Sequence, residues 1–125
     1  MLIHKDTTDT ILKCFYEVYS SLGYGFLEKV YENALILELM EQGLNCSAQL
    51  AIPVFYKETI VGNYFADVIV DNKVVVEIKA CHSFCEEHEV QLLNYLKATT
   101  FEVGLLLNFG QKPEFKRKVF SNQNK

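Results

Sequence analysis

The sequence lacks the features that mark membrane, secreted and repeat proteins. Its longest apolar runs are about five residues, far below the ~20 residues that span a bilayer. The first ten residues, MLIHKDTTDT, contain no apolar segment of a signal peptide. Four cysteines are too few and too scattered for a disulfide scaffold, so we expect reduced thiols. Without repeats, low-complexity tracts or linkers, residues 1–125 are predicted to form one cytoplasmic domain.

The chain also lacks an overall excess of positive charge, because its net charge is −4. A negative net charge is not typical of nucleic-acid-binding proteins, which usually carry an excess of positive charge. The charge is, however, unevenly distributed along the chain. Between Lys112 and Lys125, five basic residues stand against Glu114 alone, a local charge of +4. This stretch is either a solvated basic tail or a phosphate-binding edge, and charge alone leaves both open. On the second interpretation, the predicted phosphate contacts are Lys116, Arg117 and Lys118.

The sequence does contain a clear change of hydrophobic period. Helical spacing comes first, strand-like alternation follows Gly43, and a further helix precedes two final strands. The first half is predicted to contain two helices, one from Thr7 or Thr8 to Leu22 and one over Phe26–Gln42. Three strands follow, over 49–56, Ile60–Val70 and Lys73–Lys79. The last part is predicted to contain a helix, Glu86–Thr99, and two strands, Val103–Phe109 and Phe115–Phe120. Pro53 indicates that its strand lies at an edge of the sheet. Gly62 indicates a bend. The apolar run 103–109 indicates a strand that is buried on both faces. The order predicts an α/β fold, with a sheet flanked by helices.

Two carboxylates stand inside the apolar hairpin of this sheet. Asp67 lies in YFADVIV and Glu77 in KVVVEIK, and Lys79 shares a strand face with Glu77. Ionised groups in such strands are costly unless they are paired or bind a cation. Neighbouring carboxylates attract Mg²⁺, which activates water and neutralises phosphoryl charge, and a lysine can assist. The alternative is that Asp67 and Glu77 are exposed strand residues and that Lys79 is a local ion-pair partner.

The length of the hairpin loop decides whether the two carboxylates can meet. A two-residue loop, Asp71-Asn72, would place Asp67 and Glu77 on opposite faces of the hairpin. A three-residue loop, residues 71–73, places them directly opposite each other on one face. The metal-site interpretation therefore predicts the odd loop, or a bulge with the same effect. A two-residue hairpin would count strongly against the site.

Two polar positions on the predicted helices are further candidates. Glu28 lies one turn before Tyr31 on an otherwise apolar side of its helix. Gln91 lies one turn before Tyr95, on the helix that follows Lys79. Each has an alternative without a functional role. Glu28 would be a first-turn glutamate favoured by the helix dipole, and Gln91 the polar edge of an amphipathic helix.

A cluster of thiols and imidazoles after Lys79 raises the question of zinc. It consists of Cys81, His82, Cys85 and His88. The spacing falls within the range of structural zinc sites, but four ligands from one eight-residue segment close poorly into a tetrahedron. The chain contains no second C-x-x-C pair, so zinc is disfavoured.

Taken in order, five motifs resemble those of the GxxExxY proteins, a branch of the PD-(D/E)XK nuclease-like superfamily. They are G-x-x-E-x-x-Y from Gly25, A-D-V-I-V with Asp67, V-V-E-I-K-A with Glu77 and Lys79, Q-L-L-N-Y-L-K from Gln91, and G-L-L-L-N-F-G from Gly104. The resemblance covers about residues 5–120. It implies a restriction-endonuclease-like α-β-β-β-α-β core with a mixed sheet. The proline that names the superfamily is absent, and Ala66 stands before Asp67.

The resemblance also implies a function and roles for individual residues. The implied metal ligands are Asp67, Glu77 and the Ile78 carbonyl, with Glu28 beside the metal, Lys79 as the catalytic lysine and Gln91 as an accessory polar residue. The implied activity is hydrolysis of nucleic-acid phosphodiesters with Mg²⁺ or Mn²⁺, with DNA favoured over RNA. The alternative is a nuclease-like fold retained as a non-catalytic binding or assembly module. A core this small offers little surface for gripping a duplex, so we expect a homodimer or a protein partner.

Overall fold

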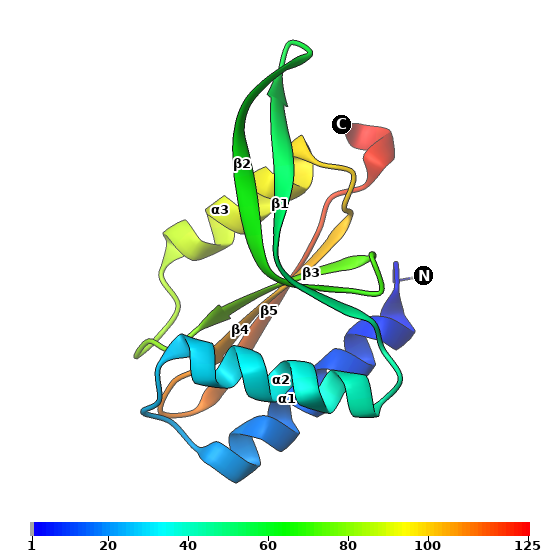
Figure 1. Cartoon of the computed structure of the whole chain (residues 1–125). Helices are drawn as coiled ribbons and strands as arrows, with labels where there is room; N and C mark the ends of the chain where they lie inside the picture. The colour runs from blue at the N-terminus through cyan, green and yellow to red at the C-terminus, as the bar shows by residue number, and fades with distance from the viewer. Residues whose placement is uncertain (1) are drawn as a thin grey trace.

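The computed structural model describes residues 2–125 and contains the predicted order of elements. The elements are α1 (Lys5–Leu22), α2 (Glu28–Glu41), β1 (Cys46–Tyr56), β2 (Thr59–Val70), β3 (Val74–Lys79), α3 (Glu86–Ala98), β4 (Val103–Phe109), β5 (Pro113–Val119) and a 3₁₀ turn (Asn122–Asn124). Figure 1 shows their arrangement. The bounds differ from the predicted ones by a few residues, and β4 agrees at both ends.

The five strands form one mixed sheet in the order β1-β2-β3-β4-β5. Only β3 and β4 run parallel, and α3 is the crossover that joins them. The predicted α/β fold with a helix-flanked sheet is therefore confirmed. Pro53 does lie in an edge strand, because β1 is the first strand of the sheet. Every residue of β4 is buried, as expected for an interior strand covered on both faces.

Helices cover both faces of the sheet and produce two apolar clusters. On one face, α1 and α2 contribute Phe15, Tyr31 and Leu35 to the larger cluster, against Val76 and Leu107 of the sheet. On the other face, Leu92 of α3 packs with Tyr64, Ala66, Val75 and Leu106. The strand β3 alternates between the clusters. Glu77 and Lys79 therefore share the face of Val75, which is the face that α3 covers.

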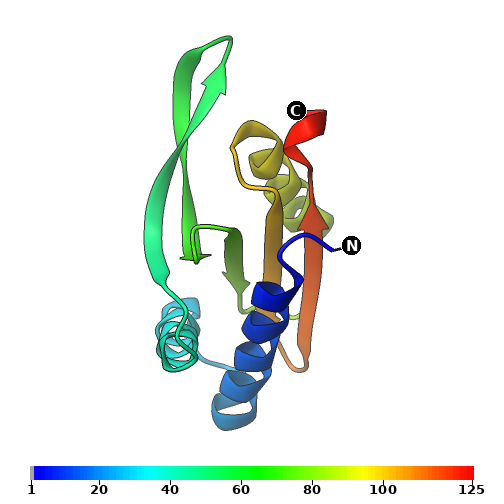
Figure 2. The ribbon, with the colours of Figure 1, turned by 90° about the vertical axis from the view of Figure 1, so that its right-hand side faces the viewer.

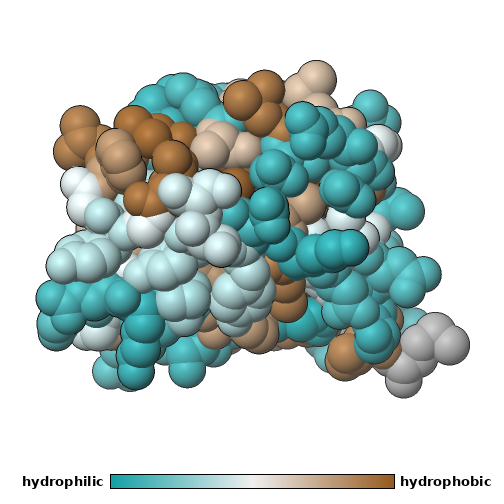
Figure 3. Space-filling view, turned by 90° about the horizontal axis from the view of Figure 1, so that it is seen from below, coloured by the Kyte–Doolittle hydropathy of each residue, from teal (hydrophilic) through white to brown (hydrophobic). Residues whose placement is uncertain are grey.

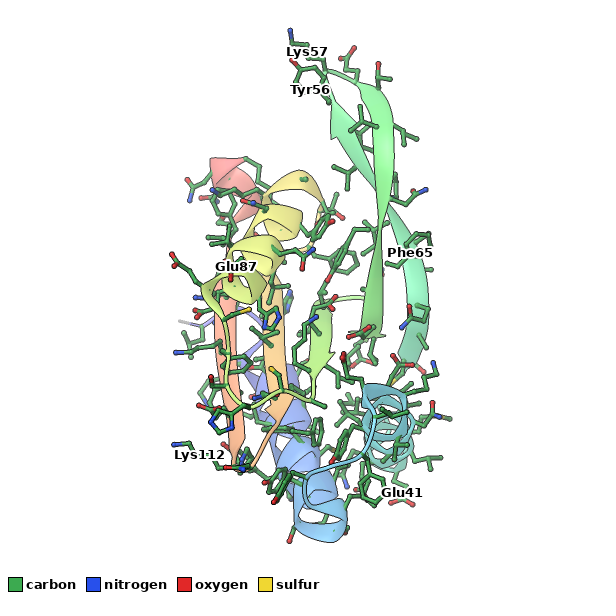
Figure 4. All side chains as sticks on the ribbon, turned by 90° about the vertical axis from the view of Figure 1, so that its left-hand side faces the viewer. Glu41, Tyr56, Lys57, Phe65, Glu87 and Lys112 are labelled. Atoms are coloured by element: carbon green, nitrogen blue, oxygen red, sulfur yellow. The ribbon has the colours of Figure 1, made fainter. Side chains whose placement is uncertain are left out.

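The distal parts of β1 and β2 project from the body as a two-stranded β-arm, which is exposed along residues 55–63 and packs on α3 at its base through Ile52 and Tyr64 (Figures 1 and 2). Its tip, Lys57-Glu58, has two left-handed residues, as a tight primed turn requires. The register changes between Val54 and Phe55, so that Val61 is unpaired next to Gly62. This bulge confirms the predicted bend. Figure 4 shows Phe65 on the side of the β-arm that faces away from α3.

The remaining surface has no large uniform apolar area on the side seen in Figure 3. Hydrophilic and intermediate residues dominate that view, with one hydrophobic cluster near a corner. Along residues 2–125, none of the helices combines the length and the apolar character that crossing a membrane requires.

The tyrosine of the G-x-x-E-x-x-Y motif has a structural position. Tyr31 is fully buried, and its ring stacks on Phe109 with centroids 4.1 Å apart. Its hydroxyl donates to the Gly23 carbonyl at 2.7 Å and accepts the Phe26 N–H at 3.2 Å. Gly25, between these two contacts, has φ +108, a conformation that favours glycine. Tyr31 thus fixes the joint between α1 and α2.

Replacing Tyr31 by phenylalanine should destabilise the fold without affecting metal binding. The substitution keeps the stacked ring but leaves the Gly23 carbonyl and the Phe26 N–H without their partner. A net hydrogen bond contributes about 0.5–1.5 kcal/mol to stability, so we expect the free energy of unfolding to fall by roughly 1–3 kcal/mol for the two lost bonds. Urea unfolding of Tyr31→Phe beside Tyr16→Phe, whose ring is 43% exposed, measures it. Equal stability of the two variants would refute a structural role of the hydroxyl.

Candidate active site

The hairpin between β2 and β3 has the odd-length loop. Val70 pairs with Val74 and Ile69 with Val75, which leaves residues 71–73 as the loop. Asp71 and Asn72 adopt left-handed conformations, and the Lys73 N–H closes the turn onto the Val70 carbonyl at 2.9 Å. Continued by one step past the last pair, this register places Asp67 opposite Glu77. The predicted loop and register are confirmed.

The strands β2 and β3 separate at the two carboxylates. Their regular pairing ends at Val68 and Val76. Beyond it, Oδ2 of Asp67 accepts the Ile78 N–H at 2.8 Å, so that a side chain replaces the backbone ladder. The N–H and C=O of one strand residue point toward the same neighbouring strand. The Ile78 carbonyl therefore faces the same gap as the Asp67 carboxylate, where a cation could contact both oxygens.

A chain of polar contacts joins Asp67 to α2. The Gln49 side-chain amide donates to Oδ1 of Asp67 at 3.3 Å and to Oε1 of Glu32 at 2.9 Å. Glu32 is only 4% exposed, and its Oε2 pairs with Lys29 at 2.5 Å. The sequence reasoning missed Gln49 and Glu32. No local sequence pattern points to Gln49, because its contact depends on a left-handed φ of 53 within β1. A pattern does point to Glu32, since it lies at helical spacing from the buried Leu35 and Leu39.

Glu77 is the carboxylate with the most perturbed environment. The Tyr64 hydroxyl donates to its Oε1, and the Tyr64 ring stacks on Tyr95 with centroids 3.8 Å apart. Burial, together with the nearby charge of Asp67, raises the pKa of Glu77 from 4.5 to about 8, despite the opposing effects of Tyr64 and Lys79. Burial and the Glu77 charge likewise raise the pKa of Tyr64. The two carboxyl groups thus share a site that disfavours two negative charges unless a cation joins them.

Glu77 and Lys79 open into a small pocket beneath α3. The pocket is lined by Tyr64, Glu77, Lys79, His88, Gln91, Leu92, Tyr95 and Leu106. The structure thus brings the predicted Gln91 to Glu77 and Lys79. It also adds Tyr64 and Tyr95, together with His88, which the sequence offered only as a disfavoured zinc ligand. His88 carried a signal that was available, since it lies one helical turn before Gln91.

Glu28, another predicted site residue, does not line the pocket. Glu28 is exposed in the first turn of α2, and its charge contributes, after burial and Cys85, to raising the pKa of Cys81. Within residues 2–125, no hydrogen bond or ion pair connects Glu28 to Asp67 or Glu77.

The three predicted phosphate contacts on β5 do not form one basic edge. Arg117 donates to the Ile3 carbonyl, on the side of α1. Lys118 pairs with Glu89 of α3 at 2.7 Å, on the opposite face. Lys116 is exposed, and its charge helps, after that of Lys118, to lower the pKa of Glu89. Lys116 therefore lies on the same sheet face as the pocket, and it forms no ion pair within residues 2–125.

The segment after Lys79 is held by β4. The buried side chain of Asn108 accepts the Cys81 N–H at 3.0 Å and donates to the Cys81 carbonyl at 2.9 Å. A Cβ on Gly110 would lie 2.6 Å from that carbonyl, so only glycine allows this approach. Across residues 2–125, no group of three or more His, Cys, Asp or Glu side chains is placed to hold a metal. The disfavoured zinc cluster is accordingly not assembled.

Comparison with known proteins agrees with the fold. A model of the PD-(D/E)XK nuclease superfamily matches residues 5–118. The chain belongs to this superfamily. The crystal structure of SSO0001 is similar, with a TM-score of 0.58 and 19% sequence identity. That match covers 74% of this chain and 50% of SSO0001, so the chain spans about half the length of that protein. No curated protein matched the chain.

Three oxygen donors lie close together at the ends of β2 and β3. The Asp67 carboxylate and the Ile78 carbonyl face one gap between these strands, and the Glu77 carboxylate lies beside Asp67. Mg²⁺ and Mn²⁺ prefer such oxygen donors, whereas zinc prefers the nitrogen and sulfur donors that are absent from this gap. Burial and the nearby charge of Asp67 raise the pKa of Glu77, and a cation bound between the two carboxylates would oppose both effects. The donor set therefore fits a hard divalent cation.

Proposed function

We propose that this chain is a metal-dependent nuclease that hydrolyses nucleic-acid phosphodiester bonds. One observation supports the proposal above all: the hairpin has a three-residue loop, whose register continues to Asp67 and Glu77, and Glu77 and Lys79 line one pocket. Asp67, Glu77 and the Ile78 carbonyl would hold Mg²⁺ or Mn²⁺, with Glu28 as an accessory acid. The five ordered motifs further support a GxxExxY protein within the superfamily. The expectations of one domain over residues 1–125 and of a cytoplasmic location belong to the same proposal.

The residues of the pocket divide the chemistry among them. When bound, the metal supplies a Lewis acid that lowers the pKa of water and neutralises phosphoryl charge. The Lys79 ammonium orients the attacking water and stabilises the negative charge that grows on the phosphoryl oxygens. Gln91 positions the water or the phosphate from the α3 side of the pocket. The water oxygen bonds to phosphorus, and the bond between phosphorus and the leaving oxygen breaks.

The direct test is a cleavage assay on a panel of substrates. Single- and double-stranded DNA and RNA are incubated with the purified chain and Mg²⁺, Mn²⁺ or EDTA. We expect cleavage with either metal and none with EDTA, with DNA cut in preference to RNA. Absence of cleavage on every substrate, together with no metal binding by calorimetry, would overturn the proposal.

Lys116 is the phosphate contact that the structure leaves available on β5. Reversing its charge with Lys116→Glu should weaken nucleic-acid binding and reduce the slope of log K against log salt by about one. Lys13→Glu is the matched control, because Lys13 is exposed on α1 and lies far along the chain from β5. Filter binding at several salt concentrations measures both variants. Equal slopes for Lys116→Glu and wild type would exclude Lys116 from the interface.

A second candidate function is a nuclease fold that binds or assembles without turnover. The net charge of −4 and the internal contacts of Arg117 and Lys118 favour it, because both reduce the positive surface that is open to nucleic acid. Under either function, a homodimer or a protein partner would supply additional surface for contact with nucleic acid. The cleavage panel separates the two functions, because a binding module retains nucleic acid without cutting it.

A further inference from the structure

His88 lies on the wall of the pocket without a role in the function proposed above. It is placed on α3 one turn before Gln91, so both side chains project from one face of the helix. It lines the pocket together with Glu77 and Lys79. The zinc interpretation does not explain it, because no group of three or more His, Cys, Asp or Glu side chains among residues 2–125 is placed to hold a metal.

The His88 ring has an unused hydrogen-bonding atom. Its Nδ1 is buried and has no hydrogen-bond partner. Within residues 2–125, the only other side-chain atom in this condition is Arg117 Nε, whose guanidinium already donates to the Ile3 carbonyl. Buried polar atoms are paired in the great majority of cases, so an orphaned one calls for an explanation. The unpaired Nδ1 belongs to a residue that lines the same pocket as Glu77 and Lys79.

The surrounding groups indicate which ligand atom would satisfy Nδ1. The groups that face His88 across the pocket are Tyr64 of β2, Glu77 and Lys79 of β3, and Gln91 and Tyr95 of α3. Glu77 Oε1 already accepts the Tyr64 hydroxyl. Lys79 offers a cation and Gln91 offers amide donors. The acceptor oxygens that remain, Oε2 of Glu77 and the amide oxygen of Gln91, make no hydrogen bond with Nδ1. A phosphate group, which carries several acceptor oxygens and negative charge, would accept a hydrogen bond from Nδ1–H and pair with the Lys79 ammonium.

We propose that His88 donates a hydrogen bond from Nδ1–H to an oxygen of the scissile phosphate. The proposal rests on the nuclease function proposed above. As the water oxygen bonds to phosphorus and the bond to the leaving oxygen breaks, negative charge grows on the phosphoryl oxygens. A fixed N–H donor interacts most strongly with that charge. His88 need not give up its proton, because the leaving oxygen is protonated by solvent.

The test compares three substitutions that separate the two ring nitrogens. His88→Asn places an amide N–H near the position of Nδ1, His88→Gln places it near Nε2, and His88→Ala removes both. Loss of one such donor costs about 10²-fold in kcat. We therefore expect His88→Ala and His88→Gln to lose about that factor while His88→Asn keeps most of the activity. Thermal midpoints of the three variants show whether each is folded.

The control variant is His82→Ala, because His82 is exposed and does not line this pocket. It should cleave like wild type. Equal losses in His88→Asn and His88→Gln, or wild-type activity in His88→Ala, would overturn the role of Nδ1.

A measurement without turnover separates this proposal from the nuclease function. Inorganic phosphate is titrated into the Mg²⁺-loaded protein while the imidazole nitrogens are followed by ¹⁵N NMR. We expect the His88 Nδ1 resonance to shift and the His82 resonances to stay in place. If wild type cleaves no substrate but Nδ1 shifts, the nuclease function fails and the phosphate contact stands. If Nδ1 does not respond to phosphate, the contact is refuted whatever the cleavage assay shows.

Discussion

Replacing Glu77 by glutamine should abolish metal-dependent cleavage and, without metal, stabilise the fold at neutral pH. Glutamine keeps the shape and the hydrogen bond with Tyr64 but carries no charge beside Asp67. We expect a loss of at least about 10³-fold in cleavage, because a metal ligand and its charge disappear together. Glu87→Gln is the matched control, because Glu87 is exposed at the start of α3. Equal activity of the two variants would place the metal elsewhere.

The stability effect follows from the pKa of Glu77 and depends on pH. Folding raises this pKa from 4.5 to about 8, so between these values the folded state binds a proton that the unfolded state has lost. The free energy of unfolding therefore decreases as pH rises through that window, and the stabilising contribution is lost above pH 8. At about 1.4 kcal/mol per pKa unit, the full effect is on the order of 5 kcal/mol. Glu77→Gln should flatten this dependence, and urea unfolding at pH 5 and pH 8.5 measures it. A wild-type profile without slope in this window would contradict the burial of the carboxyl.

Replacing Lys79 by methionine should reduce cleavage by about 10²- to 10³-fold, the range for removing a preorganised charge from a transition state. Methionine keeps most of the aliphatic side chain, so the packing under α3 is preserved. Metal binding should remain, because Asp67, Glu77 and the Ile78 carbonyl are untouched. This separation of binding from turnover distinguishes Lys79 from the ligands.

Single-turnover cleavage and Mn²⁺ binding should therefore be measured on the same preparation. Lys73→Met is the control, since Lys73 is exposed in the loop of the same hairpin, outside the pocket. If Lys79→Met cleaved like Lys73→Met, the lysine would be only an ion-pair partner of Glu77. If Lys79→Met also lost metal binding, the role of Lys79 would be to hold the metal ligands in position.

The sequence predicted the fold well because each element has a distinct period. The run Val103–Phe109 was identified at both ends, since a strand buried on both faces is continuously apolar. The sequence left the hairpin loop at two or three residues, and only the metal-site interpretation predicted the three-residue loop that the structure has.

The missed parts of the site depend on contacts between distant segments. Gln49 reaches Asp67 because β1 lies beside β2 and because one residue adopts a left-handed conformation. Neither fact is encoded in a local pattern. Tyr64 looked like a core aromatic, and it is one, since it is buried and stacked on Tyr95. Only its hydroxyl, aimed at Glu77, gives it a second role. A phosphate-binding edge was one of two interpretations of the basic run on β5, and alternation along the strand sends Arg117 and Lys118 to opposite faces.

The central claim is that Asp67 and Glu77 together form a divalent metal site. Calorimetric titration of Mg²⁺ into wild type at pH 7, in buffers of different ionisation enthalpy, tests it most directly. Because the pKa of Glu77 is about 8, its carboxyl is largely protonated at pH 7 and must lose that proton to bind the metal. We predict one binding event that releases close to one proton at pH 7 and much less at pH 9, and no binding in Glu77→Gln. An absence of binding in wild type, or binding in both proteins with the same proton release, would contradict the claim.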